Sequence, residues 1–136
     1  MTLTDPYDIR TSLYVLTYNS PDQFEALLES FKKYDQDFLK YPRKILIDNS
    51  TNSKTTSKYN ILCRENGFEH IKRVGNTGIS GGRQFVSEHF GASNSDYYIF
   101  FEDDMNLCES VDNLYRKSLR SEEHTSELQS RLHLVC

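Results

Sequence analysis

The sequence predicts an α/β fold with a doubly wound, mainly parallel sheet, and three observations support this prediction. Short apolar runs that suit buried strands alternate along the chain with amphipathic stretches that suit helices. The run at residues 97–101 is apolar or aromatic throughout, which is typical of a strand covered on both faces of a parallel sheet. The 136 residues, 37% of them hydrophobic, are enough for one core and at most about one domain.

The first strand and the first helix are predicted near the N-terminus. Residues 12–16 form a buried strand. Ser20, Pro21 and Gln23 then have the spacing of a capping box with proline at the first helical position, so a helix should begin here. The apolar residues of this helix have the spacing of a face that packs on a sheet, and they are Phe24, Leu27, Leu28 and Phe31.

Two more strands and a weaker helix are predicted in the middle of the chain. Residues 44–47 form the second strand, and a polar loop rich in Ser, Thr and Asn follows it. A helix is expected over residues 55–65, with Gly67 in its stop signal. Residues 70–74 then form a short third strand.

A glycine-rich turn at residues 75–83 opens the last helix, which should end at Gly91, and residues 97–101 form the fourth strand. Because strands and helices alternate, each crossover should be right-handed. The inner face of the last helix is expected to consist of Gly82, Phe85, Val86, His89 and Phe90.

Composition argues against several classes of protein. The net charge is −4 and no basic cluster occurs, which argues against a nucleic-acid partner. Cys63, Cys108 and Cys136 form neither a disulfide framework nor a metal-binding pattern. The first ten residues are polar and no run has transmembrane length. These features predict a soluble cytoplasmic protein, and leave peripheral contact with the inner membrane face open.

The tail, residues 120–136, differs in character from the rest of the chain. Its first eleven residues resemble an in-frame translation of a common sequencing-library adapter. We therefore expect a domain at residues 1–119, an artefactual tail at 120–136, and a natural sequence that continues beyond the break. The alternative is a natural solvated helix, because three apolar residues have helical spacing, namely Leu128, Leu132 and Val135.

Removal of residues 120–136 should leave the melting temperature unchanged, because the tail is polar and has no place in the predicted sheet. Thermal unfolding of the full and shortened chains, followed by circular dichroism, checks this. A loss of several degrees corresponds to about 1 kcal/mol in a domain of this size. Such a loss would show that the tail packs on the fold.

Polar residues follow the predicted strands, at the edge of an open α/β sheet where ligands bind. Such side chains can bond a base, a ribose, a diphosphate or a metal. After the first and second strands they are Thr17, Tyr18, Asn19, Asp48 and Asn49. After the third strand comes the glycine-rich turn with Asn76, Gly78, Gly81, Gly82 and Arg83, and after the fourth strand come Glu102, Asp103 and Asp104.

Three consecutive carboxylates after the last strand predict a divalent cation, because like charges repel each other and hard cations bind oxygen ligands. If the strand continues, alternate side chains share a face, so Glu102 and Asp104 should point the same way. Asp104 is then expected to be the direct ligand, with Asp103 turned towards the backbone or the sugar. The alternative is an acidic turn that simply closes a strand.

The order of four motifs, over residues 12–108, resembles the nucleotide-sugar-binding half of GT-A glycosyltransferases, closest to family 2. These motifs are Leu-Thr-Tyr-Asn, Ile-Asp-Asn-Ser, Asn-x-Gly-x-x-Gly-Gly-Arg and Phe-Glu-Asp-Asp. The resemblance implies transfer of a sugar from a nucleoside diphosphate, with UDP-sugars favoured, to a glycan or lipid-linked acceptor. It also implies inversion of configuration and a Mg or Mn cofactor.

The resemblance also implies roles for single residues. Asp48 would accept a hydrogen bond from a ring N–H such as that of uracil, Glu102 and Asp104 would hold the metal, and the general base would lie beyond the break. The implied donor-binding set is Thr17, Tyr18, Asn19, Asp48, Asn49, Asn76, Gly78, Gly81, Gly82, Arg83 and Asp103. The chain departs from the family pattern at Asn52, Gln84 and Glu102, which leaves the nucleoside open.

Two other functions are excluded by the positions of their required residues relative to the predicted strands. A phosphoacceptor signalling domain needs an acidic pair after the first strand, where Thr17 and Asn19 stand. A dinucleotide oxidoreductase needs its glycines after the first strand, whereas Gly78 and Gly81 follow the third. The remaining alternative is a catalytically inactive fragment that binds nucleotide without turnover.

Overall fold

The computed structural model describes residues 11–73, 78–95, 97–107 and 115. The elements in chain order are β1 (Thr11–Thr17), α2 (Pro21–Tyr34), α3 (Asp37–Lys40), β2 (Arg43–Asp48), α4 (Ser53–Asn66), β3 (Phe68–Lys72), α5 (Gly78–Gly91) and β4 (Tyr97–Glu102). The strands form one parallel sheet in the order β3-β2-β1-β4.

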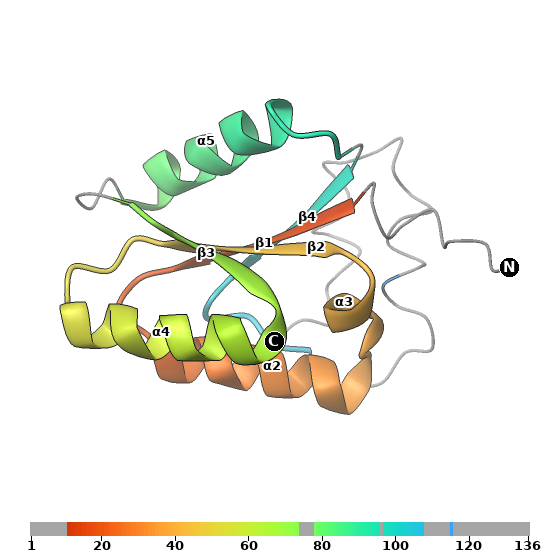
Figure 1. The fold of residues 1–136 in the computed structure, drawn as a ribbon, viewed down its shortest axis with the longest axis horizontal. Helices are drawn as coiled ribbons and strands as arrows, with labels where there is room; N and C mark the ends of the chain where they lie inside the picture. Colours follow the sequence, from red (N-terminus) through yellow and green to blue (C-terminus); the bar gives the residue numbers. More distant parts are fainter. Residues whose placement is uncertain (1–10, 74–77, 96, 108–114, 116–136) are drawn as a thin grey trace, which may run out of the picture.

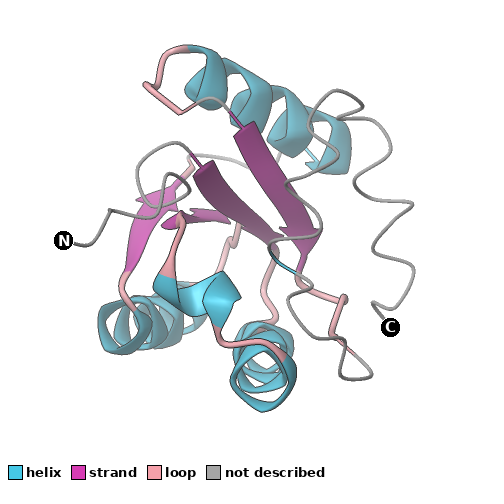
Figure 2. Ribbon diagram, turned by 90° about the vertical axis from the view of Figure 1, so that its right-hand side faces the viewer, coloured by secondary structure: helices cyan, strands magenta, loops and turns pink. Residues whose placement is uncertain are grey.

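Helices cover both faces of this sheet, which confirms the predicted doubly wound α/β fold. Helices α2, α3 and α4 lie on one face and α5 lies on the other (Figure 1). The view turned by 90° shows the same two helical layers with the strands between them (Figure 2). No helix in the described part of the chain is both long and apolar enough to cross a membrane.

Strand β1 organises the core, because every one of its residues is buried. Alternate side chains point to opposite faces of a strand. Leu13 and Val15 join the larger core beneath α2 and α4, while Tyr14 and Leu16 join the smaller core with Val86 of α5. Burial of each such side chain contributes about 1.5–3 kcal/mol. The apolar run read from the sequence therefore corresponds to a strand packed on both sides.

The short helix α3 was not expected from the sequence, and an aromatic cluster explains it. Phe38 of α3 stacks on Phe31 with ring centroids 4.9 Å apart and meets Phe101 edge-on at 5.8 Å. Four residues are too few to show a helical period, so only the packing of Phe38 reveals this element.

The start of α2 was predicted at the right position, but the predicted capping box is wrong. Ser20 is the N-cap and Pro21 is the first helical residue. The Ser20 hydroxyl donates to the carbonyl of Tyr18 at 2.9 Å and makes no cap bond. Instead, the N–H groups of Gln23 and Phe24 donate to the Ser20 carbonyl at 3.1 and 3.2 Å.

The other boundaries lie within a few residues of their predicted positions. Gly67 ends α4 with φ 75°, as its stop signal indicated. Asn52 is the N-cap of α4, and its side chain accepts a hydrogen bond from the Lys54 N–H at 2.8 Å. Strand β3 begins and ends earlier than the predicted 70–74, whose last residue lies outside the described part.

Candidate functional site

The ends of the strands are joined to each other by backbone hydrogen bonds. The N–H of Asn49 donates to the carbonyl of Thr17, and that of Asp103 donates to the carbonyl of Leu16, each at 3.0 Å. The N–H of Arg73 donates to the carbonyl of Asp48 at 2.9 Å. The parallel ladder therefore continues past the strand ends and gathers these polar segments along one edge of the sheet.

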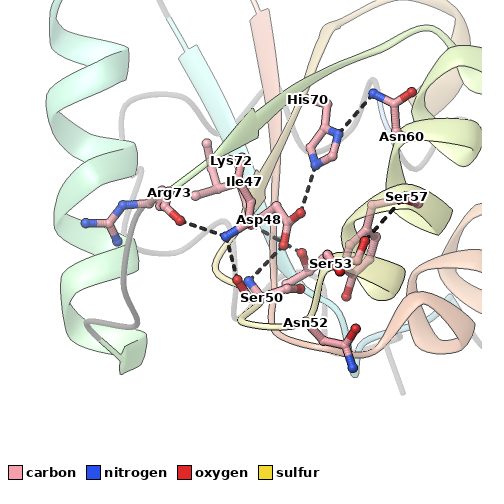
Figure 3. Close-up of polar contacts among 12 residues, drawn as sticks. Ile47, Asp48, Ser50, Asn52, Ser53, Ser57, Asn60, His70, Lys72 and Arg73 are labelled. Carbon is pink, nitrogen blue, oxygen red and sulfur yellow. Dashed lines mark hydrogen bonds and ion pairs between the residues drawn. The ribbon is translucent and has the colours of Figure 1, made fainter.

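Asp48 ends β2 as a buried carboxylate with both oxygens bonded. Its side chain has no exposed surface. One oxygen, Oδ1, accepts the N–H of Ser50 at 2.8 Å, and Oδ2 lies 2.8 Å from Nε2 of His70 (Figure 3). Burial alone would raise the pKa of the Asp48 carboxyl, but the hydrogen bonds from His70 and Ser50 outweigh it and lower the pKa. Asp48 is therefore an anion held inside the protein.

The end of β1 forms the rim beside Asp48. Thr17 is buried and donates to the Ile47 carbonyl at 3.3 Å, whereas Tyr18 is 47% exposed. Asn19 is the one described non-glycine residue with positive φ, at 48°, a conformation that asparagine tolerates. Its N–H donates to the Ser50 hydroxyl at 3.0 Å. This bond ties the ends of β1 and β2 together.

The end of β3 carries two cations that sequence reasoning missed. Lys72 donates to the carbonyl of Ser50 (Figure 3). The guanidinium of Arg73 reaches Oδ1 of Asn49 at 3.4 Å. Arg73 also lies over the ring of Phe85 in α5, 4.9 Å from its centroid. The predicted strand ran to residue 74, so both cations were placed inside the strand and not at its end. In the structure β3 ends at Lys72.

The start of α5 lies against the ends of β1 and β2. A Cβ on the buried Gly82 would come 2.7 and 2.8 Å from the two methyl carbons of Leu16 and 3.1 Å from the Asn49 amide nitrogen. Only glycine allows this close approach. The predicted residues Gly78 and Gly81 also lie in the first turns of this helix, and Asn76 lies outside the described part.

Arg83 is exposed, but an ion pair holds its guanidinium. Nη2 donates to Oε1 of Glu102 at 2.7 Å, and the guanidinium lies over the ring of Phe100, 5.6 Å from its centroid. The side chain of Glu102 is 19% exposed. The pair joins α5 to β4 at the carboxyl edge, so Arg83 and Glu102 are brought together, although they had been assigned to diphosphate and metal.

The three carboxylates do not continue the strand, so the expected alternation of side chains is wrong beyond Glu102. A turn follows β4, closed by the N–H of Met105 donating to the Glu102 carbonyl at 3.1 Å. Asp103 faces the backbone as expected, since it accepts the N–H of Tyr18 at 3.1 Å, and Asp104 is exposed. Among the described residues, no three or more His, Cys, Asp or Glu side chains gather as metal ligands.

The carboxylates act on each other electrostatically. Burial raises the pKa of the Asp103 carboxyl, and the charges of Asp104 and Glu102 raise it further against the hydrogen bond from Tyr18. A cation at this position would remove that repulsion. The arrangement can therefore offer oxygen ligands at the rim, beside the buried Asp48 carboxylate and the exposed ring of Tyr18.

Comparison with known proteins shows the fold. No family profile matches the chain, and neither does any curated protein. The crystal structure of S. aureus TarS is 18% identical over 82% of this chain, with a TM-score of 0.58. TarS 1-349 is 21% identical over 85% with a TM-score of 0.59, and its complex with UDP is 20% identical over 85% with 0.58. The chain spans 20, 33 and 32% of the three TarS chains.

Proposed function

We propose that this chain is the donor-binding half of a glycosyltransferase of the GT-A type, similar to family 2, which binds a nucleoside diphosphate sugar. One observation carries the proposal: the ends of β1, β2 and β4 and the start of α5 meet at one edge of the sheet, with polar groups from each. Ligands of open α/β sheets bind at this edge. The likeness to TarS, one structure of which contains UDP, supports the same proposal.

The nucleoside would lie over the ends of β1 and β2. Tyr18, exposed at the rim, offers a ring for stacking on a base, and the Asn19 amide, bonded to Thr51 and Asn52, holds the loop after β2 at the same edge. Asp48 supplies a carboxylate that accepts a ring N–H. Because this carboxylate is buried, neighbouring rim side chains must move before a base can reach it. Nucleotide binding should therefore change the positions of the side chains that cover Asp48.

The diphosphate would lie at the carboxyl edge beside the start of α5, where two arginine side chains lie. Arg83 is one, and its partner Glu102 can be exchanged for a phosphate oxygen because the guanidinium is largely exposed. Arg73, next to Asn49, is a second cation at the same edge. These two guanidinium groups would neutralise charge on the leaving diphosphate, which is the electrostatic task of a glycosyltransferase donor site.

Oxygen ligands near β4 fit a hard divalent cation such as Mg or Mn. Asp104 is exposed and would hold it, whereas Glu102 would join only after release from Arg83. When bound, such a cation stabilises the negative charge of a departing diphosphate. No described residue is proposed as the general base or as an acceptor-binding group. A fragment that binds nucleotide without turnover is the second candidate, because the chain spans only 20–33% of the TarS chains.

Replacement of Asp48 by alanine should weaken UDP binding about tenfold or more, since a hydrogen bond to a charged group contributes about 1.5–3 kcal/mol. Calorimetry of the parent chain and Asp48→Ala with UDP, GDP and dTDP, with Mn present, checks this. Manganese affinity should change little, because Asp48 lies at β2 and the carboxylates lie beyond β4. Equal affinity of parent and variant for all three nucleotides would refute the role of Asp48, and no binding by the parent would refute the proposed function.

A further inference from the structure

His70 of β3 reaches Asp48 of β2 across the sheet. In the parallel register Leu46 lies opposite His70, and Asp48 lies two residues further along the same face. That face packs on α4, and the His70 side chain is only 10% exposed there. The imidazole therefore meets the Asp48 carboxylate at 2.8 Å in a part-buried position (Figure 3).

The partners of His70 determine where its proton lies. The carboxylate of Asp48 can only accept, so Nε2 must carry the hydrogen. On the other side of the ring, Nδ1 lies 3.5 Å from the amide nitrogen of Asn60 in α4, which can only donate. The edge of the ring also contacts Tyr59, with 6.4 Å between the ring centroids. His70 therefore directs its Nε2–H at the Asp48 carboxylate.

The two carboxylate oxygens of Asp48 therefore have different hydrogen-bond partners. Oδ2 is committed to His70, deep against α4. Oδ1 accepts the N–H of Ser50, and the Ser50 hydroxyl, which also bonds this buried carboxylate, is the group that a base would replace. Without the bond from His70, the carboxyl group could rotate about its own axis and lose this orientation.

We propose that His70 is a positioning residue for nucleobase selection: it holds Asp48 so that Oδ1 is presented to a ring N–H of the base. The inference rests on the proposed function and deepens it. Uracil carries a hydrogen at N3, whereas cytosine carries a lone pair there. A carboxylate held in one orientation therefore favours UDP over CDP, and one that is free to rotate discriminates less.

Calorimetry with UDP and CDP tests this in the full chain, in His70→Leu and in His70→Gln. In His70→Leu the affinity for UDP should fall about tenfold, as for one hydrogen bond to a charged group, and the preference for UDP over CDP should fall with it. In His70→Gln an amide N–H replaces Nε2–H, so both the affinity and the preference should largely return. A merely structural loss would not be rescued in this way.

His89 provides the matched control on the opposite face of the sheet. It is a partly buried histidine of α5 whose Nδ1 lies 2.7 Å from the hydroxyl of Tyr14. His89→Leu removes a comparable internal hydrogen bond far from Asp48, so the ratio of UDP to CDP affinity should stay at the parental value. Thermal unfolding of all variants shows whether each is folded, and His70→Gln keeps the test decisive if His70→Leu does not fold.

The possible failures are distinguishable. If the parent chain binds neither nucleotide, the proposed function is wrong and the inference is wrong with it. If Asp48→Ala loses UDP affinity while His70→Leu and His70→Gln both keep the parental affinity and preference, the inference alone is wrong. Tighter UDP binding by His70→Leu would mean that His70 competes with the base for the carboxylate, which would also overturn it.

Discussion

Replacement of Asp104 by asparagine should abolish the Mn-dependent binding of a UDP-sugar. Asp104 is the exposed carboxylate in the turn after β4, while Glu102 is engaged by Arg83 and Asp103 by the Tyr18 N–H. It is therefore the carboxylate best placed to bind a cation directly. Mutation of residues that only hydrogen-bond to a metal ligand lowers metal affinity by about 10- to 100-fold. Removal of a direct ligand should therefore lower the affinity by more than roughly 100-fold.

The matched control is Asp103→Asn, the same change one residue earlier. Its amide oxygen can still accept the Tyr18 N–H, so the turn should persist and Mn affinity should fall much less. Titration of Mn in the presence of UDP measures both variants against the parent. An Asp104→Asn chain that binds Mn as tightly as the parent would mean that the metal lies elsewhere or is absent.

Substitution of Gly82 by valine should cost several degrees of melting temperature and weaken nucleotide binding. Any Cβ at this position would overlap the methyl groups of Leu16, at 2.7 and 2.8 Å, and press on Asn49. Leu16 is 5% exposed and packed in the core, so it has little room to move. Overpacking of this kind costs about 1–3 kcal/mol. The start of α5 would be pushed away from the sheet edge where the nucleotide is proposed to bind.

Gly91→Val, at the other end of the same helix, is the control for this substitution. Nothing lies within 4 Å of a Cβ at Gly91, and the position is exposed. Glycine and valine differ little in helix propensity, so this variant should be close to the parent in melting temperature. Thermal unfolding and UDP calorimetry compare the two. Equal melting temperatures for Gly82→Val and Gly91→Val would show that the contact with Leu16 is relaxed in solution.

The sequence predicted those parts of the fold that depend on local periodicity. The apolar run that became β1 and the period of apolar residues in α2 are properties of neighbouring residues, so they could be read without knowing the fold. The glycine signal at the end of α4 was confirmed for the same reason. Helix α3 could not be found in this way, since Phe38 is buried by residues distant in sequence.

The prediction of the site was also correct in some parts and wrong in others. The ends of β1, β2 and β4 were predicted to within one residue, but β3 ends earlier than expected. The acids after β4 were expected to alternate as in a strand and instead lie in a turn. His70 was overlooked because nothing in its neighbours along the chain distinguishes it from any other strand residue. Only the register between β2 and β3 brings it against Asp48. The assignment of Asp48 to the base and of Asp104 to the metal stays a prediction.

The sequence by itself determined that the ends of β1, β2 and β4 lie at one carboxyl edge, because crossover helices make neighbouring strands parallel and parallel strands end together. Tertiary structure decided how these residues are paired. Asp48 is joined to His70, and Arg83 to Glu102. The first pairing depends on the register of two strands and the second on the close approach of α5 to the sheet at Gly82. Both pairings join segments that are far apart in the chain, and local patterns of residues do not show which distant segments meet.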